Sequence, residues 1–119
     1  MKTNFGILKE LKEGETRVAL TPDTVGMLIS EGLSVSVESG AGFLSGFGDE
    51  QYEKVGAKIL QSAAEVWEKS NIIVKVKEPQ KCEYQYFRED LVIFSYLHLA
   101  VEEELTRELL KKKVCAIAS

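Results

Sequence analysis

Three side chains of this 119-residue sequence have the chemistry needed to bind and react with a small carboxylate: Arg17, Lys77 and His98. The guanidinium of an arginine matches the two oxygens of a carboxylate, and the ammonium of a lysine supplies a compact positive charge. The imidazole of a histidine titrates near neutral pH and can exchange a proton with a bound molecule. Together these residue types indicate chemistry on a small organic acid, provided that the fold brings them to one place.

Each of the three residues also has an ordinary structural explanation. Arginines such as Arg17 are most often solvated, and a histidine in an apolar context such as His98 is often a hydrogen-bonded core residue. Lys77 fits a surface charge pattern with Lys75 and Glu78. Taken one residue at a time, the structural explanations are the stronger ones for Arg17 and His98 and about equal for Lys77. The functional interpretation therefore depends on where the fold places the three side chains.

The elements that would position these residues follow from an alternation of short apolar runs with amphipathic stretches along the whole chain. This pattern predicts one α/β domain with an open, mainly parallel sheet and helices on both faces, a Rossmann- or flavodoxin-like three-layer sandwich. A continuous apolar run, such as residues 91–96, is typical of a strand buried on both faces. The predicted strands are residues 5–8, 33–38, 58–60, 72–76, 91–96 and 114–118, and the predicted helices are residues 21–32, 49–55, 62–69 and 101–113.

Several helix ends are predicted from residues that satisfy free backbone groups. Thr21 and Ser62, the latter three positions before Glu65, are expected to cap the amino ends of two helices. Asp49 is expected to cap a short helix, and Gly32 to end the first helix in a left-handed conformation. The segments between these elements are expected to be surface loops.

The predicted sheet gives the three candidate residues a common location. In an open parallel sheet, ligands bind at the carboxyl ends of the strands, where loops and helix starts meet. Arg17 lies in the loop after the first predicted strand, Lys77 directly after the strand at 72–76, and His98 just beyond the strand at 91–96. The sequence therefore predicts that all three converge on one crevice.

The glycine-rich segment 40–46 has a second possible function, as a loop that binds the phosphates of a dinucleotide. It follows the second strand rather than the first, and its third glycine stands one position late. The helix that follows begins with Asp49, whose charge would repel a phosphate. A turn-rich loop that contacts a partner lobe is the preferred interpretation.

Composition excludes several classes of function. Fifteen Lys and Arg against nineteen Asp and Glu give a net charge of −4, and the charges are scattered, which argues against a nucleic-acid partner. Cys82 and Cys115 are far apart, with one histidine in the chain, which favours two reduced thiols and no metal site. No apolar run approaches the roughly 20 residues that span a bilayer, and no secretory signal is recognisable. We expect a cytoplasmic protein without a membrane partner.

Five separated motifs resemble, in order and spacing, the amino-terminal domain shared by alanine dehydrogenases and proton-translocating transhydrogenase alpha subunits. The resemblance covers essentially the whole chain. Lys77 with its following Glu-Pro, and His98 between two leucines, resemble the alanine dehydrogenase branch. The motifs are Lys-Glu at 9–10, Arg-Val-Ala-Leu-Thr-Pro at 17–22, Glu-Ser-Gly-Ala-Gly at 38–42, Lys-Val-Lys-Glu-Pro at 75–79 and Tyr-Leu-His-Leu-Ala at 96–100.

The resemblance implies a reaction and roles for the three residues. The reaction is reversible, NAD-dependent oxidative deamination of L-alanine to pyruvate and ammonia. Arg17 and Lys77 would hold the carboxylate and the carbonyl oxygen of the substrate, and His98 would bond to the substrate and assist proton transfer. Lys77 and His98 are thus the expected catalytic residues, and all three are expected to bind substrate.

Alanine dehydrogenases continue into a dinucleotide-binding lobe with a glycine fingerprint and a catalytic acid, and then return to complete the first domain. We therefore expect residues 1–119 to be a truncated amino-terminal substrate-binding domain that binds neither NAD nor a metal by itself and is not catalytically complete. Its expected partners are L-alanine or pyruvate and other copies of the chain. A dimer is expected for this chain and, by the resemblance, a hexamer for a complete enzyme.

Two other functions remain open. The chain could be a non-catalytic module that binds small carboxylates or assembles with another protein. It could also be the amino-terminal fragment of a transhydrogenase alpha subunit, which Lys77 and His98 disfavour.

Overall fold

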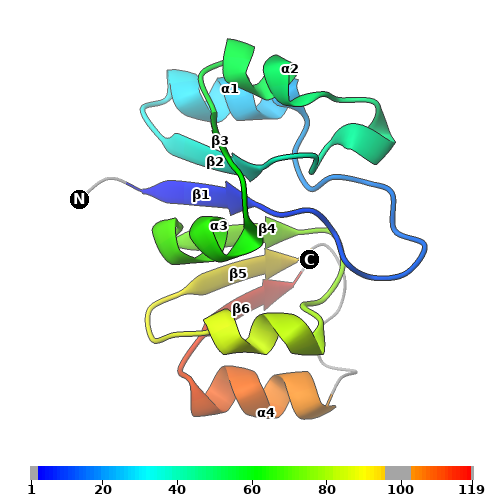
Figure 1. Ribbon diagram of the computed structural model, residues 1–119. Helices are drawn as coiled ribbons and strands as arrows, with labels where there is room; N and C mark the ends of the chain where they lie inside the picture. The colour runs from blue at the N-terminus through cyan, green and yellow to red at the C-terminus, as the bar shows by residue number, and fades with distance from the viewer. Residues whose placement is uncertain (1–2, 96–102, 119) are drawn as a thin grey trace.

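Within residues 3–95 and 103–118, which the computed structural model describes, six parallel strands form one sheet in the order β3-β2-β1-β4-β5-β6 (Figure 1). Every predicted strand and helix is present, with ends that differ by one or two residues where they are described. The strands are β1 (Asn4–Ile7), β2 (Ser34–Glu38), β3 (Lys58–Leu60), β4 (Ile72–Lys75), β5 (Val92–Ser95) and β6 (Cys115–Ala118). The helices are α1 (Pro22–Ser30), α2 (Asp49–Lys54), α3 (Ala63–Lys69) and α4 (Glu103–Lys111), with short 3₁₀ helices η1 (Phe43–Ser45) and η2 (Lys81–Tyr86).

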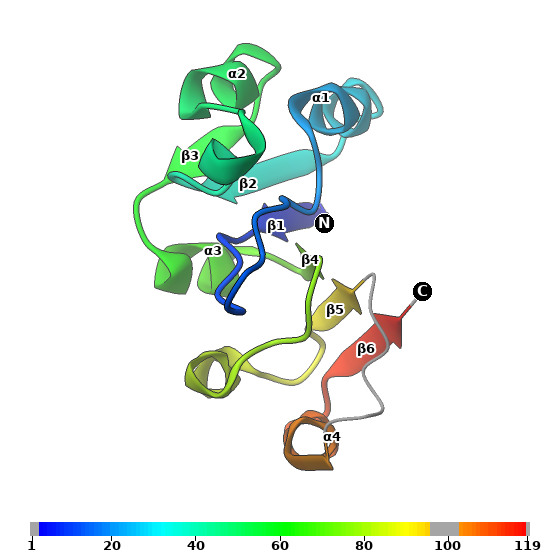
Figure 2. The same ribbon diagram turned by 90° about the vertical axis from the view of Figure 1, so that its right-hand side faces the viewer.

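The strand order separates the helices into two layers. The chain passes from β1 through β2 to the edge strand β3, and then returns across β1 to β4, β5 and β6. Because crossovers between parallel strands are right-handed, this reversal puts the later helices on the opposite face of the sheet from the earlier ones. Figure 2 shows α1 and α2 on one face, and α3, η2 and α4 on the other. The prediction of a three-layer α/β sandwich is confirmed.

Each helix layer covers its own apolar cluster on the sheet. One cluster joins β1 and β2 to α1 and α2, and includes the fully buried residues Ile7, Val25 and Tyr52. The other joins the central strands to α3, η2 and α4, and is centred on Trp67. The Trp67 ring stacks on Tyr86 of η2 with 5.6 Å between ring centroids, so a segment that was expected to be a loop is held as a 3₁₀ helix by aromatic packing.

The helix-capping predictions are correct at Thr21 and Ser62. Their hydroxyl oxygens accept the backbone N–H groups of Thr24 at 3.4 Å and Glu65 at 3.3 Å. Gly32 is left-handed, with φ of +89°, directly after the end of α1. These three positions show local chemistry deciding where α1 and α3 begin or end.

The prediction that Asp49 caps α2 is wrong. Gly48 is the residue at the cap position, and its N–H donates to the side-chain oxygen of Gln51 at 2.9 Å. The Asp49 carboxylate instead accepts the hydroxyl of Ser39 at 2.6 Å and the N–H of Gly40 at 2.9 Å. The turn after β2 offers these two donors to the carboxylate, so Asp49 fastens the glycine-rich segment instead of the helix.

The prediction that β5 is buried on both faces is also wrong for the part of the chain that the structure describes. Ile93 and Ser95 are buried, whereas Val92 and Phe94 on the opposite face are only half-buried. They line an apolar hollow of about 320 Å³, together with residues such as Ile72 and Ile117. The reason is that α1 and α2 lie over β1, β2 and β3, and among the described helices none covers this face at β4 to β6 (Figure 2).

Candidate functional site

The candidate site lies where the sheet changes its direction of winding. β1 and β4 are neighbours in the sheet, but the chain leaves β1 toward α1 on one face and leaves β4 toward η2 on the other. The segments that follow two such strands diverge and leave a crevice at their carboxyl ends, where ligands bind in open α/β sheets. Arg17 lies in the segment after β1 and Lys77 in the segment after β4, as the sequence predicts.

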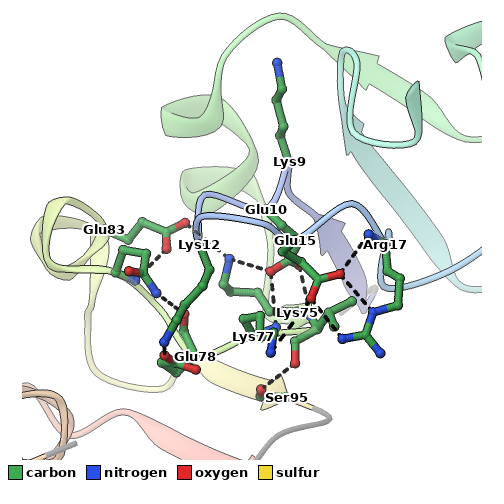
Figure 3. Close-up of polar contacts among 12 residues, drawn as sticks. Lys9, Glu10, Lys12, Glu15, Arg17, Lys75, Lys77, Glu78, Glu83 and Ser95 are labelled. Carbon is green, nitrogen blue, oxygen red and sulfur yellow. Dashed lines mark hydrogen bonds and ion pairs between the residues drawn. The ribbon is translucent and has the colours of Figure 1, made fainter. Parts of the chain in front are cut away.

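Arg17 and Lys77 meet on either side of Glu15 (Figure 3). The Glu15 carboxylate accepts Nε and Nη2 of Arg17, each at 2.9 Å, and it also accepts the backbone N–H of Arg17 at 2.8 Å. Nζ of Lys77 lies 4.0 Å from Oε1 of Glu15. The side chain of Glu15 is only 4% exposed, against 66% for Arg17 and 28% for Lys77. The two cations are therefore accessible to solvent, and the carboxylate that lies between them is buried.

Electrostatics keep the Glu15–Arg17 pair ionised. The hydrogen bond from Arg17 outweighs the effect of burial and lowers the pKa of Glu15 to about 2. The same hydrogen bond raises the pKa of Arg17 above its ordinary value. A carboxylate between a guanidinium and an ammonium leaves one net positive charge, which suits a ligand that carries a single negative charge.

A second carboxylate holds the backbone from which Lys77 projects. Glu10 accepts the N–H groups of Val76 at 2.9 Å and Lys77 at 3.2 Å, where β4 ends. Nζ of Lys75 lies 3.4 Å from Glu10 and 3.5 Å from Glu83, and all three of these side chains are buried. Burial raises the pKa of Glu83, and the charge of Lys75 offsets part of that effect. The loop after β1 is thus tied to the end of β4 by a buried ionic cluster.

Lys75 corrects the surface-charge interpretation of this segment. It is fully buried, so it cannot be part of a solvated pattern with Lys77 and Glu78. Glu78 pairs instead with Lys12 of the loop after β1. Burial acts to raise the pKa of Glu78, but the hydrogen bond from Lys12 and nearby charges outweigh it and lower the pKa. This pair adds a further link between the two segments that carry Arg17 and Lys77.

A hollow of about 220 Å³ opens beside Glu15 and Arg17, between the loop after β1 and the glycine-rich segment. At about 30 Å³ for each water molecule in the liquid, its volume is enough for a small organic acid. Gly40, Ala41, Phe43 and Leu44 form one wall, and the Phe43 side chain is exposed. A larger hollow of about 500 Å³ lies at the other end of the sheet, around Asn4, Ser34 and Lys58, far from this cluster of paired charges.

The glycine-rich segment does not fit the phosphates of a dinucleotide. Its backbone N–H at Gly40 and the hydroxyl of Ser39 already donate to Asp49. A phosphate approaching those donors would meet a carboxylate. This geometry agrees with a turn-rich loop, as preferred from the sequence, whereas the predicted contact with a partner lobe stays a prediction.

His98 lies outside the described residues, so its predicted place in the site stays a prediction. In residues 3–95 and 103–118, no cluster of three or more His, Cys, Asp or Glu side chains is arranged to hold a metal ion. The helices within those residues include none with the length and apolar character needed to cross a membrane. Cys82 and Cys115 are free and exposed.

Sequence reasoning found Arg17 and Lys77 but missed the acids that hold them. Glu10 belongs to a motif of the family resemblance, yet its two hydrogen bonds to the end of β4 join residues 66 and 67 positions apart. Glu15 stands two positions before Arg17, which is the one local signal that could have identified it. An acid two positions before an arginine on an irregular loop can be predicted to accept a hydrogen bond from that arginine.

Comparison with known proteins places these observations in a family. The family model described as alanine dehydrogenase/PNT, N-terminal domain, matches residues 6–119. The alanine dehydrogenase of Bacillus subtilis (strain 168) is 53% identical over 114 residues, which are 96% of this chain and 30% of that protein. This chain thus spans about a third of the length of the curated relatives it matches.

Two solved structures resemble the fold closely. A structure titled L-alanine dehydrogenase superposes with a TM-score of 0.90 at 38% identity, covering 98% of this chain and 32% of that one. A transhydrogenase from Sinorhizobium meliloti superposes with a TM-score of 0.87 at 30% identity, covering 97% of this chain and 34% of that one. Both branches of the resemblance are therefore represented among close structural relatives.

Proposed function

Because this chain belongs to the family of alanine dehydrogenase/PNT N-terminal domains, we propose that it is the substrate-binding domain of an NAD-dependent alanine dehydrogenase. The proposed reaction converts L-alanine, NAD and water into pyruvate, ammonia, NADH and a proton. The observation that carries the proposal is the meeting of Arg17 and Lys77 across one buried carboxylate at the carboxyl ends of neighbouring strands.

The proposed roles follow from the charges of the two side chains. Arg17 binds the carboxylate of alanine or pyruvate and fixes the direction of the α-carbon, a contribution that can reach several kcal/mol of barrier reduction. Lys77 stabilises negative charge as it develops on the substrate oxygen. By the family resemblance, His98 gives and takes the proton as ammonia adds and water leaves.

We place the binding of NAD outside these 119 residues. When bound, NAD would accept a hydride from the α-carbon of the substrate. Asp49 already accepts the hydroxyl of Ser39 and the N–H of Gly40 at the start of the glycine-rich segment, and this chain spans 30% of the length of its Bacillus relative. In this proposal the chain orients the substrate carboxylate and its oxygen, and it is not catalytically complete alone.

The transhydrogenase branch is the second candidate, because a solved transhydrogenase shares the fold at 30% identity. The alanine dehydrogenase branch is favoured by the higher identity of its curated members, at 47–53% for the relatives from Methanococcus maripaludis and Bacillus subtilis. By the family resemblance, Lys77 and His98 also favour it. A purely carboxylate-binding module without catalysis remains the alternative that the experiment below separates.

A domain exchange tests the proposal directly. This chain would replace the matching 114 residues of the Bacillus subtilis alanine dehydrogenase, and oxidation of NADH would be measured with pyruvate and ammonia. We expect turnover, and in Arg17→Lys we expect KM for pyruvate to rise about tenfold, because lysine keeps the charge but loses the two-pronged contact.

The control is Lys54→Arg, at an exposed position of α2. It should leave both kcat and KM for pyruvate unchanged. A folded chimera that binds NADH but never turns over would contradict the enzymatic proposal. Millimolar pyruvate binding by the 119-residue chain without such turnover would instead favour the non-catalytic module.

We further propose a cytoplasmic, self-associating protein. The two free cysteines suit a reducing compartment. The apolar hollow over β4 to β6, which Ile72, Phe94 and Ile117 help to line, suits contact with another copy of the chain.

A further inference from the structure

We propose that Glu15 is a positioning residue that determines which edge of Arg17 receives the substrate and limits the site to acids with one carboxylate. This inference rests on the proposed function and adds a residue to it. Figure 3 shows the Glu15 carboxylate lying between Arg17 and Lys77.

The guanidinium of Arg17 has two edges that can bind a carboxylate. Arginine carries five N–H donors in one plane, so it can bind a carboxylate along its side, through Nε and Nη2, or at its end, through Nη1 and Nη2. Glu15 takes the side edge, with Oε2 to Nε and Oε1 to Nη2 both at 2.9 Å. The end edge is the one that Glu15 leaves for a second carboxylate.

Glu15 also holds the Arg17 side chain in one orientation. Exposed ion pairs seldom hold one geometry, because two long side chains move independently in water. Here the acid is nearly buried, with its side chain 4% exposed, and the same carboxylate also accepts the backbone N–H of Arg17 at 2.8 Å. Both ends of the Arg17 residue are therefore held by one group, which fixes a side chain that is otherwise 66% exposed.

Glu15 also sets the net charge that a ligand meets beside Arg17 and Lys77. Glu15 stands 4.0 Å from the ammonium of Lys77 as well as in contact with Arg17, so the three groups together carry one positive charge. A monocarboxylate neutralises that charge. The second carboxylate of a four-carbon keto diacid would instead add a negative charge near Glu15 and near Glu10, which lines the hollow beside Arg17. Lys9 also belongs to the lining of that hollow, but its side chain points away from the charge cluster (Figure 3). Repulsion between like charges would then weaken its binding.

The experiment compares Glu15→Gln with the unaltered protein in the chimera and in the 119-residue chain. Glutamine keeps the shape but loses the charge and one of the two matched acceptors. We expect KM for pyruvate to rise about tenfold with kcat changed less than about threefold, because the lost contact orients the ground state and the transition state alike. We also expect the ratio of kcat/KM for oxaloacetate to that for pyruvate to rise about tenfold, since repulsion is removed.

Glu13→Gln is the matched control, because Glu13 is an exposed acid of the same loop. This substitution should leave KM for pyruvate and the oxaloacetate-to-pyruvate ratio of kcat/KM unchanged. Glu15→Asp, which restores the charge, should recover the discrimination against oxaloacetate. Melting temperatures of all variants separate loss of folding from loss of positioning.

The possible outcomes distinguish a failure of the Glu15 role from a failure of the proposed function. If the unaltered chain binds pyruvate and Glu15→Gln binds it equally well, with unchanged discrimination, the role of Glu15 is refuted while the proposed function stands. If Glu15→Gln is folded but loses kcat with KM unchanged, the positioning role is also refuted. If the unaltered protein neither binds nor turns over pyruvate, both the proposed function and this inference fail.

Discussion

Lys75 is a charged residue in a place where charge is costly. Its ammonium is fully buried and lies 3.4 Å from Glu10 and 3.5 Å from Glu83. Burying an ion pair is often neutral for stability, but removing one partner leaves an uncompensated charge. The value of Lys75 to the site is indirect, because it supports Glu10, which in turn holds the backbone of Lys77.

Replacing Lys75 by methionine should therefore destabilise the fold strongly. With Lys75→Met, two buried carboxylates face each other without a cation, and we expect the free energy of unfolding to fall by about 3–5 kcal/mol. Urea denaturation measures the change. Lys81→Met is the control, since its ion pair with Glu104 is exposed, and it should cost no more than about 1 kcal/mol. Equal losses for the two variants would contradict the assignment.

Glu15 should leave a signature in acid stability. Its pKa is about 2 in the folded protein against an ordinary value of 4.5, so between these values the unfolded chain binds more protons. The stability that Glu15 contributes is complete above pH 4.5 and is lost as the pH falls toward 2. From about pH 5 to about pH 2, Glu15→Gln should lose less free energy of unfolding than the unaltered chain. Parallel curves for the two proteins would show that Arg17 does not depress this pKa.

The elements show where local chemistry is sufficient to predict structure and where it is not. Thr21, Ser62 and Gly32 act on their own helices, so their roles follow from the sequence. Asp49 has the right type and position for a cap, but the turn at Gly40 offers its donors to the same carboxylate. The spacing of residues along the sequence does not show that the turn and the helix compete for the Asp49 carboxylate.

Asp49→Ala should loosen the glycine-rich segment while leaving α2 in place. The substitution removes the acceptor of Ser39 and Gly40, and we expect a loss of about 1–3 kcal/mol of stability. Amide exchange at Gly40 should accelerate, whereas that of α2 should change little. Glu50→Ala, which alters the neighbouring exposed acid, is the control. Faster exchange throughout α2 would restore the capping interpretation.

The candidate site was predictable in its cations and not in its acids. Arg17 and Lys77 could be placed together because the carboxyl ends of parallel strands share one edge of the sheet. Glu10 and Lys75 are hidden from such reasoning, since burial of a charged side chain depends on partners more than sixty positions away. The open face at Val92 and Phe94 escaped prediction for a similar reason, as strand composition does not say which helix covers a strand.

The described helices cover the two faces of the sheet unequally. The face of the sheet opposite α3, η2 and α4 presents apolar side chains from β1, β4, β5 and β6, and Ile117 among them is 45% exposed. A contiguous apolar surface of this kind is typical of an interface.

We expect the 119-residue chain to form dimers through this surface. Ile117→Lys places a charge on it and should shift the mass measured by light scattering toward the monomer. Leu44→Lys, at an exposed apolar position of the glycine-rich segment, should leave the mass unchanged. A monomer over a wide range of concentration for the unaltered chain would contradict this expectation.

The adjacency of β1 and β4 has a consequence for how the protein folds. Their pairing aligns Phe5 with Ile72 and Ile7 with Val74, and it closes a loop of more than sixty residues, a slow and entropically costly event. The Arg17 guanidinium and the Lys77 ammonium come close together only after β1 and β4 have paired. A small acid that must contact both Arg17 and Lys77 can bind only the folded protein, in which the segments after β1 and β4 lie together. Raising the concentration of that acid should therefore slow unfolding, and its binding should report that folding is complete.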